Sequence, residues 1–514
     1  MYKLLLRTIQ YCFVVLSAMV LVACLYSSNQ QIGIGYTLGH FAFLAVMWML
    51  LERIFPKNGA PASRREILFL SVVCFLTCWM VCEYLPAIGV RGQTADSSGA
   101  LKCLLAGIPC RSHDTRYFYW ATYEIFLSVL GVIFAPAMRT GQLANAFFAA
   151  LAVMPVFRIC ERVGGRSIAR FIVLMLISSP ALLLWGSVLS STIISAVFML
   201  YAAYYFFEAS DCGKIDRRFV LAAVLSGVAL GFSYIFKSII FIFNIALIVY
   251  VLLVVFRRPG WRVVMRASLL FLLVFSVSKY TGRCSTHVLA VVGNSPGLVE
   301  GKGHFVEDVL YELILGLNLH TRGCWYTPLA HEVVKLDSAG RWRKLKEVVK
   351  KDWRAYPKLL VDKFVGNNGT HCGPGSIGVR IRANSQADLV KRTGPYRCPL
   401  WAIYIMNGFQ VGFALITLLA ALGMCFIRGR DLSYFCPGIV SIVIIAEFTV
   451  MLMLIEGNSC YRVAIYPFHF LVLPYIKGWY EMWDRVRRNS VVSRLKEHLR
   501  SILAKWQKTL GVLS

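Results

Sequence analysis

The hydrophobic and polar positions of this chain alternate on the scale of whole helices. Apolar stretches of about 20 residues, each long enough to cross roughly 30 Å of hydrocarbon as an α-helix, are separated by shorter polar segments. Twelve stretches have this character: 10–27, 37–54, 67–86, 143–159, 167–187, 192–208, 219–236, 238–256, 263–280, 401–427, 434–455 and 463–480. The pattern predicts an all-α polytopic membrane protein with about 12 transmembrane helices, juxtamembrane helices and a large outer loop domain.

Basic residues indicate how these helices are oriented. With the N-terminus inside, the inner connections are 57–65, 158–170, 214–218, 257–262, 428–430 and the tail from Arg485, and all are basic, as the positive-inside rule requires. A thirteenth apolar stretch at 118–136 would reverse this arrangement if it crossed the membrane. We therefore interpret it as an interfacial helix on the outer side, with Tyr117, Tyr119, Trp120 and Tyr123 at headgroup depth. Both termini are then cytoplasmic.

The composition excludes several classes of protein. Of 514 residues, 58% are hydrophobic and 16% are charged, whereas soluble domains carry about a quarter charged residues. A soluble enzyme, a nuclear protein and a secreted disulfide scaffold are excluded. The net charge of +28 lies mostly in short connections, where it favours anionic lipid. The sequence has no nucleic-acid-binding module, no zinc-ligand spacing and no phosphate-binding glycine loop, so no nucleic acid partner is expected.

The N-terminal segment and the cysteines give further information about the membrane topology. Residues 1–27 resemble a signal peptide, but the apolar run is long and is predicted to be retained as a first span. Seven of the 16 cysteines map to the predicted outer side, where disulfides can form. They are Cys103, Cys110, Cys284, Cys324, Cys372, Cys398 and Cys460. Their number is odd and their connectivity does not follow from sequence, so the pairing stays open.

The predicted spans divide the chain into five parts. They are 1–60 with N-terminal extra spans, 61–280 with the transmembrane core and a first outer loop at 87–142, 281–400 as the outer loop domain, 401–483 with the C-terminal spans, and 484–514 as a basic amphipathic cytoplasmic tail. The outer loop domain carries 18 basic and 10 acidic residues. This excess indicates either an anionic partner such as a lipid phosphate or an ordinary solvated face.

Ionisable residues at the ends of spans are costly unless they have a function. Asp96 follows the third predicted span and has the chemistry of a general base just above the membrane. An aspartate before an apolar run is also a common helix N-cap. Lys237 lies between two predicted spans with almost no connection, so it either reaches headgroups by snorkelling or binds a phosphate.

Two other segments carry polar candidates. Glu456 and Arg462 occupy the short outer turn between the last two predicted spans, where they either pair with each other or bind a ligand. Gly316-Leu317-Asn318 and Gly323-Cys324-Trp325 form a polar part of the large outer loop, which is either a binding element or ordinary surface.

The order of these features resembles the GT-C superfamily of polytopic glycosyltransferases, and most closely its bacterial members akin to protein O-mannosyltransferases and aminoarabinose transferases. The resemblance covers about residues 67–480. It rests on the following motifs: Asp96, Ala106-Gly107 and Tyr117-Phe118-Tyr119; Asn145, the basic turn 162–166 and Ser179-Pro180; Gly227, Gly231 and Lys237; Gly316-Leu317-Asn318 with Trp325; and Glu456, Arg462 and Pro467. In two places the chain departs from the family. Ser190-Ser191-Thr192 stands where members often have an acidic residue, and residues 1–60 have no counterpart.

The resemblance implies an inverting glycosyltransferase that moves a sugar from a polyprenyl-phosphate donor to an acceptor hydroxyl on the outer, periplasmic face of the cytoplasmic membrane. It implies that Asp96 is the catalytic base and that Lys237 and Arg462 bind the donor phosphate. The residues implied to line the donor or substrate are Tyr117, Tyr119, Tyr123, Asn318, Trp325 and Glu456. A divalent metal stays open as a cofactor. The sugar is open too, as is the acceptor, which is a lipid, a polysaccharide or a protein.

Two rival classes fit the gross layout. O-antigen polymerases and ligases also have about a dozen spans and a large outer loop, and they would use outer arginines and a histidine. Candidate outer histidines are His113, His304, His320, His331 and His371. A lipid transporter fits less well, because the sequence has no internal repeat and its predicted spans are almost free of acids.

Overall fold

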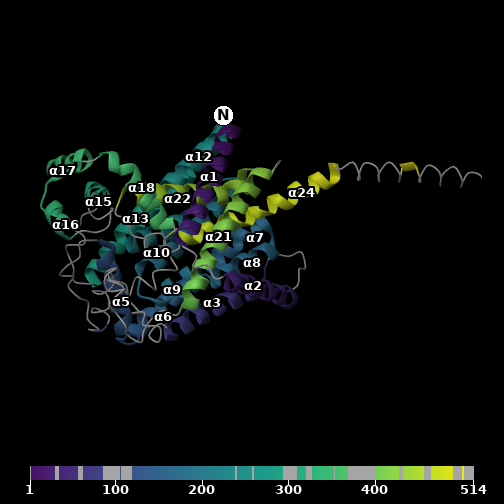
Figure 1. Ribbon diagram of the computed structural model, residues 1–514, viewed down its shortest axis with the longest axis horizontal. Helices are drawn as coiled ribbons and strands as arrows, with labels where there is room; N and C mark the ends of the chain where they lie inside the picture. Colours follow the sequence, from purple (N-terminus) through teal and green to yellow (C-terminus); the bar gives the residue numbers. More distant parts are fainter. Residues whose placement is uncertain are drawn as a thin grey trace, which may run out of the picture.

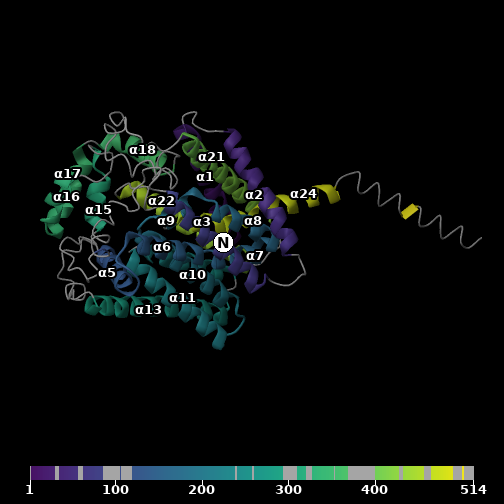
Figure 2. The same ribbon diagram turned by 90° about the horizontal axis from the view of Figure 1, so that it is seen from below.

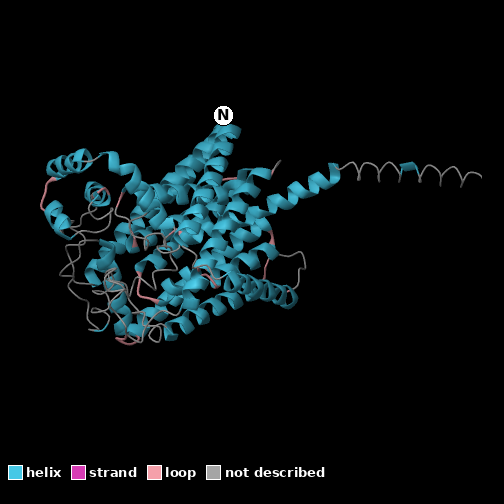
Figure 3. Ribbon diagram, viewed as in Figure 1, coloured by secondary structure: helices cyan, strands magenta, loops and turns pink. Residues whose placement is uncertain are grey.

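The protein is represented by a computed structural model. The structure describes residues 2–28, 34–55, 62–84, 105, 118–237, 240–257, 260–292, 309–319, 327–351, 353–368, 400–427, 432–455, 465–489 and 501–502. Within these ranges the regular elements are helices, and no β-strand is present (Figure 3). The predicted all-α membrane architecture is confirmed.

All twelve predicted stretches contain helix. The helices of the first half are α1 (Tyr2–Ser28), α2 (Ile34–Ile54), α3 (Arg64–Tyr84), α5 (Phe118–Ile133), α6 (Met138–Leu151), α7 (Val153–Gly164), α8 (Arg166–Ile177), α9 (Pro180–Ser187), α10 (Ser191–Asp211) and α11 (Arg217–Phe236). Those of the second half are α12 (Ile240–Arg257), α13 (Trp261–Val292), α15 (Val309–Gly316), α16 (Thr327–Val334), α17 (Ser338–Lys351), α18 (Tyr356–Asn368), α21 (Leu400–Phe426), α22 (Leu432–Leu454), α23 (Tyr466–Val472) and α24 (Lys477–Asn489).

The number of spans is lower by structural criteria than the pattern predicts. Among the described residues, nine helices are long and apolar enough to cross a membrane, or ten if α8 and α9, bent by 52° at their junction, form one span. The last predicted stretch, 463–480, is divided, because the seven-residue α23 is followed by a 3-10 helix at Leu473–Ile476 and then by the charged α24. A total of about 12 therefore stays a prediction.

Two predicted boundaries move. Helix α6 begins at Met138, inside the predicted first outer loop, and α13 continues to Val292, twelve residues beyond its predicted end at 280. The stretch at 118–136 is helical as expected and forms α5, which packs against α11, α6 and α13. An apolar stretch ends where the sequence becomes polar, but helical backbone hydrogen bonding continues past that point. This explains why α6 and α13 extend beyond the predicted stretches.

The polar contacts between helices define two ends of the bundle. At the first, here called the Lys237 end, α3, α9 and α11 end while α6 and α10 begin. Gln142 Nε2 there donates to the carbonyl of Ser187 at 3.0 Å, and Arg139 pairs with Glu83 at 2.5 Å. At the other, here called the Glu66 end, α3, α8 and α11 begin while α7 and α10 end. The basic connections 158–170 and 214–218, both predicted to be inside, belong to the Glu66 end.

Part of the positive charge at the Glu66 end is neutralised within the protein. The fully buried carboxylate of Glu66 accepts a hydrogen bond from Arg170 Nε at 2.6 Å and another from Arg166. Arg170 also lies 3.1 Å from Glu52. The turn between α7 and α8 depends on Gly165, whose φ of 87° is a left-handed conformation that glycine adopts without strain. The basic connection 158–170, predicted to face inside, is therefore partly a structural ion cluster.

The N-terminal extra spans join the C-terminal half of the bundle. Helix α1 packs along α21, and α2 packs against α21 and α8; α1, α2 and α21 lie side by side in Figure 2. Arg7 Nη1 donates to the carbonyl of Cys425 at 2.7 Å, and Trp48 Nε1 donates to that of Ser167 at 3.1 Å.

Helices α15 to α17 form a small second core within the predicted outer loop domain, at the left of Figure 1. Its buried side chains include Tyr311, Ile314, Leu315, Ala330 and Val333. Lys344 of α17 lies 2.8 Å from Glu332 of α16, and this hydrogen bond raises the pKa of Lys344.

Candidate functional site at the Lys237 end

Lys237 occupies the break between α11 and α12. Its backbone is extended, with φ −162° and ψ 126°, and its N–H donates to the carbonyl of Ser233 at 3.0 Å, which closes the last turn of α11. The side chain is only 6% exposed. A lysine that only snorkelled to headgroups would keep its charged end outside the protein, so its burial favours a binding or positioning role.

The helix that leaves the predicted first outer loop is fixed beside Lys237. Thr122, near the start of α5, donates its hydroxyl proton to the carbonyl of Ile235, two residues before Lys237. One residue later, the hydroxyl of Tyr123 lies 3.2 Å from Asn145 Oδ1 on α6. Both contacts bury polar groups, and such groups are stable there only when they are paired. The start of α5 is therefore tied to α11 and α6 at the same end of the bundle.

Asn145 connects the segments at this end. The side chain is fully buried, and its Nδ2 donates to the carbonyl of Val188 at 2.7 Å and to that of Ser190 at 2.9 Å. With its oxygen facing Tyr123, the amide uses both donors and its acceptor. The turn from α9 to α10 is thus held by α6, and Ser190 also caps α10 by accepting from the N–H of Thr192 at 3.2 Å.

A second hydrogen-bonded pair lies one turn further into the bundle. Ser195 of α10 and Ser233 of α11 have hydroxyl oxygens 2.9 Å apart, and the hydroxyl of Ser195 is also 3.1 Å from the carbonyl of Ser233. On the neighbouring α11 and α13, Gly227 and Gly231 allow close approach. A Cβ atom on Gly231 would lie 2.8 Å from the carbonyl oxygen of Ser278. The glycines of the Gly227, Gly231 and Lys237 motif therefore pack α13 against α11.

We expect Asn145→Ala to lower the free energy of unfolding by about 2–4 kcal/mol, because two buried carbonyls lose their donors and a small cavity opens. Tyr123→Phe removes one hydroxyl from the same cluster and should cost only about 1 kcal/mol. Thermal denaturation of the purified protein in one detergent measures both variants. Equal midpoints for the two variants would contradict the role of Asn145 as the central contact.

Most of the predicted site residues lie outside the described part of the chain. These are Asp96, Tyr117, Trp325, Glu456 and Arg462, and for Tyr119 only the helical backbone is described. Lys237 and Tyr123 are brought to the same end of the bundle through Thr122, Ile235 and Asn145. Tyr123 is buried among helices, and its hydroxyl has a partner inside the bundle.

Asn318 belongs to a different cluster. It follows the C-terminus of α15, and its N–H donates to the carbonyl of Leu315 at 3.2 Å. Gly316, two residues earlier, lies against the backbone of Ile455 at the end of α22, where a Cβ atom would come 2.2 Å from the Ile455 carbonyl carbon. The close packing explains the glycine of the Gly316-Leu317-Asn318 motif.

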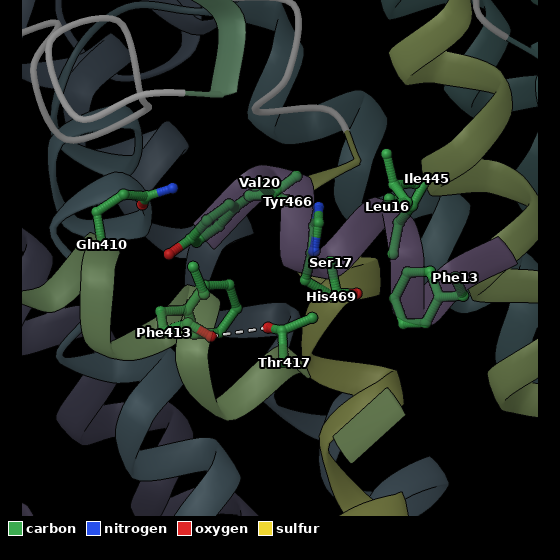
Figure 4. A pocket seen from close by; sticks show the side chains of 11 residues that line it. Phe13, Leu16, Ser17, Val20, Gln410, Phe413, Thr417, Ile445, Tyr466 and His469 are labelled. Carbon is green, nitrogen blue, oxygen red and sulfur yellow. Dashed lines mark hydrogen bonds between the residues drawn. The ribbon is translucent and has the colours of Figure 1, made fainter. Parts of the chain in front are cut away.

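A pocket lies between α1, α21, α22 and α23, and Lys237 is not among its lining residues (Figure 4). Its lining is mostly apolar but includes Ser17, Gln410, Thr417, Tyr466 and His469. The hydroxyl of Ser179, at the α8–α9 break, lies 3.2 Å from that of Tyr466. The Ser179-Pro180 motif thus contacts α23, which also lines this pocket.

The described residues offer few ligands for a metal ion. Where the family often has an acidic residue, Ser190, Ser191 and Thr192 supply neutral hydroxyls, and Ser190 is engaged in capping α10. Within the described ranges no group of three or more His, Cys, Asp or Glu side chains could hold a metal ion. The residues at this turn do not fit a metal site. The described Cys284 of the predicted outer side is a free, exposed thiol.

Sequence reasoning missed three residues of this site, which are Thr122, Ser195 and Ser233, and it also missed Lys363, a buried lysine of α18. Asn145 entered only as part of a family motif. A polar residue inside an apolar stretch is the signal that could have identified it.

No protein-family model matches the chain, and no curated protein sequence matches it. Among solved structures, the chain is similar to ArnT from Cupriavidus metallidurans bound to undecaprenyl phosphate, with a TM-score of 0.37 and 14% identity over 81% of this chain and 78% of that one. It is also similar to the archaeal oligosaccharyltransferase AglB from Archaeoglobus fulgidus in complex with an inhibitory peptide and a dolichol-phosphate. That TM-score is 0.34, with 13% identity over 84% of this chain and 59% of AglB. An Archaeoglobus fulgidus oligosaccharyltransferase in complex with Zn and sulfate has a TM-score of 0.34 and 15% identity, over 81% of this chain and 55% of that one.

Proposed function

We propose that this protein is an inverting glycosyltransferase of the cytoplasmic membrane that moves a sugar from a polyprenyl-phosphate donor to an acceptor hydroxyl on the outer face. Its partners are then the lipid donor, membrane lipids and an acceptor that is a lipid, a polysaccharide or a protein. The proposal places both termini in the cytoplasm, the Lys237 end outside and the Glu66 end inside.

The observation that carries the proposal is the burial of Lys237 beside the anchored start of α5. The lysine occupies a helix break at the end of the bundle where α5, the helix that follows the predicted first outer loop, packs against α11. A donor whose phosphate sits at the membrane surface presents an anion at that depth, and a lysine binds phosphate as a compact positive charge. The sequence motifs around Asp96, Lys237 and Arg462 support the same assignment.

The proposed reaction is a single displacement. Asp96 accepts the proton of the acceptor hydroxyl as its oxygen forms a bond to the anomeric carbon of the sugar. The bond from that carbon to the phosphate oxygen breaks, and its electron pair leaves with the polyprenyl phosphate. The phosphate group changes from one negative charge to two, so Lys237 and Arg462 stabilise the departing group most strongly as the bond breaks.

The stereochemical outcome follows from the number of carboxylates. One base and one displacement invert the anomeric carbon, whereas a retaining enzyme ordinarily needs a second, nucleophilic carboxylate. In this chain, Ser190, Ser191 and Thr192 occupy the turn where a second acid is often found in the resembled family. The proposed reaction assigns no step to a metal ion.

Lys237→Met tests the proposal directly. Because the variant loses a charge-assisted hydrogen bond, worth about 1.5–3 kcal/mol, we expect the Kd for undecaprenyl phosphate to rise roughly 10- to 100-fold. Binding is measured in nanodiscs with the purified full-length protein. Lys214→Met is the matched control, since it removes the same charge from an exposed lysine at the Glu66 end.

Two outcomes count against the proposal. If wild-type protein does not bind undecaprenyl phosphate, the donor class is wrong. If Lys237→Met and Lys214→Met bind it equally well, Lys237 does not bind the donor phosphate and has only a structural role. A product that retains the anomeric configuration would contradict the single displacement.

A further inference from the structure

The small core of α15, α16 and α17 stands on the end of α22. Gly316, the last residue of α15, lies against the backbone of Ile455, which directly follows α22. Lys363 of α18 holds the same junction, because its Nζ donates to the carbonyl of Gly316 at 2.9 Å and to that of Ile455. Helix α17 packs against α15, on the side away from α22 (Figure 1 and Figure 2). It is therefore separated from the end of this span by about one helix diameter, roughly 10 Å.

One side of α17 attaches the helix to the rest of the small core. Leu345 is buried against α15 and α16. Arg341 Nε donates to the carbonyl of Val333 at 3.2 Å, and Lys344 lies 2.8 Å from the carboxylate of Glu332. The three α17 positions are three and four residues apart, so they lie on the same side of the helix. Two of the basic residues of α17 are thus used within the domain.

The other side of α17 combines tryptophan with basic side chains and is open. Trp342 is 52% exposed and Val349 is 38% exposed. Arg343, Lys346 and Lys350 are exposed as well, and within the described ranges none of these three side chains forms an ion pair. The spacing of three and four residues between these positions places them in two neighbouring lines along the helix. They extend over about 12 Å.

A second open tryptophan follows directly after α17. Trp353 begins the 3-10 helix Trp353–Ala355 and is 66% exposed. The guanidinium carbon of Arg354 lies 5.7 Å from its ring centroid, within the range of a cation–π contact. Exposed tryptophan is uncommon on a water-facing surface without a function, and tryptophan is enriched where proteins bind partners. We call the six exposed residues the Trp342 surface; they are Trp342, Arg343, Lys346, Val349, Lys350 and Trp353.

The chemistry of the Trp342 surface selects an anionic, sugar-like ligand over a lipid bilayer. The face of an indole ring carries negative charge and attracts the polarised C–H groups of a sugar ring. Arginine and lysine bind carboxylate and phosphate groups. A helix that lies in a bilayer has its charged residues on the face opposite the apolar one, whereas here tryptophan and basic residues share one face. The width of α15 also keeps α17 away from the end of the span.

We propose that the Trp342 surface binds an acidic polysaccharide and that this polysaccharide is the acceptor of the sugar. The tryptophan rings stack on sugar rings, and Arg343, Lys346 and Lys350 bind the acidic groups. The binding itself does not depend on the proposed function, but the role of the polysaccharide as acceptor rests on it. The predicted outer loop domain then selects the acceptor by charge as well as by shape.

Binding of oligosaccharides to the full-length protein in nanodiscs of neutral lipid tests the surface. The acidic probe is hexagalacturonate and the neutral probe is maltohexaose. We expect the acidic probe to bind about tenfold more tightly, and high salt to remove this preference. Trp342→Ala should raise the Kd for hexagalacturonate about tenfold, as at a central aromatic contact. Trp261→Ala is the matched control, since it removes a tryptophan that is 71% exposed at the start of α13, and it should leave the Kd unchanged.

A charge variant keeps the proposal testable if Trp342→Ala does not fold. Lys350→Glu reverses an exposed charge and should abolish the preference for the acidic probe. Lys335→Glu is its control, because it makes the same change at an exposed position of α16 and should retain the preference. Equal binding of the two probes by the wild-type protein, or equal Kd values for each variant and its control, would overturn the proposal.

Brominated lipids test the bilayer as the alternative occupant. They quench the fluorescence of tryptophans that lie in the membrane. We expect the double variant Trp342→Phe/Trp353→Phe to lose only emission that brominated lipid does not quench in the wild-type protein. Loss of quenched emission would place these tryptophans in lipid and would overturn the assignment to a polysaccharide.

Transfer assays with labelled polyprenyl-phosphate sugars separate this inference from the proposed function. We expect Trp342→Ala to raise the KM for the acidic acceptor about tenfold and to leave the Kd for undecaprenyl phosphate unchanged. If hexagalacturonate binds as expected but the wild-type protein transfers no sugar, the proposed function fails and the binding surface holds. If acidic and neutral acceptors are used equally well and Trp342→Ala changes neither, the acceptor assignment fails and the proposed function holds.

Discussion

Asp96→Asn is expected to abolish glycosyl transfer while leaving the protein folded and able to bind polyprenyl phosphate. A general base contributes about 10²–10⁴ in rate, and asparagine has nearly the shape of aspartate but cannot accept the proton. Binding should persist, because removing a negative charge does not weaken attraction to a phosphate. Transfer is measured with labelled polyprenyl-phosphate sugars and the purified protein, and binding with the same lipid phosphate.

The control for this prediction is Asp362→Asn, the same chemical change at an exposed position of α18. It should retain full transfer. Near wild-type transfer by Asp96→Asn would remove Asp96 from the role of base. The alternative that it caps a helix would then be favoured, in which case the variant should be only slightly destabilised, since asparagine is also a good N-cap.

The second large effect is expected at the opposite end of the bundle. Glu66→Gln should lower the free energy of unfolding by about 3–5 kcal/mol, because it removes one partner from a buried ion cluster and leaves Arg170 with a buried charge that is only partly compensated. Both Glu66 and Arg170 have fully buried side chains. The measurement is the thermal midpoint in a single detergent, and unfolding is monitored as the loss of monodisperse protein on heating.

An exposed ion pair provides the comparison. Glu83 and Arg139 are also close, at 2.5 Å, but their side chains are 49% and 43% exposed. Glu83→Gln should therefore cost at most about 1 kcal/mol, as is usual for surface pairs. If Glu66→Gln is no less stable than Glu83→Gln, the cluster at the Glu66 end is not what holds α3 to α8.

The sequence anticipated the local elements better than the contacts between them. Helices lie in all twelve predicted apolar stretches because hydropathy over about 20 residues is a local property. The extension of α13 and the division of the last stretch into α23, a 3-10 turn and α24 were not anticipated. They depend on backbone hydrogen bonding and on Pro474, which has no N–H to continue a helix.

In the candidate site, too, the local elements were predicted better than the contacts between them. Lys237 was found because a lysine between two apolar stretches is conspicuous, and its position at a helix break agrees with that prediction. Whether it is buried could not be predicted, since its burial depends on α5 being tied to Ile235 by Thr122, a contact across 113 residues. The basic turn at 162–166 served only to orient the helices, and the pairing of Arg166 with Glu66, 100 residues away, could not be predicted.

By itself, the sequence determined that this is a helical membrane protein, where its helices lie along the chain, and which connections share the basic side. These properties follow from composition and from short-range patterns of hydrophobicity and charge. Only the tertiary structure decided that Asn145 joins α5, α6 and the turn from α9 to α10, that Glu66 and Arg170 form a buried cluster, and that Lys363 bridges Gly316 and Ile455. Each of these contacts joins residues at least 22 positions apart, and such pairing is set by how the helices pack and not by any local pattern.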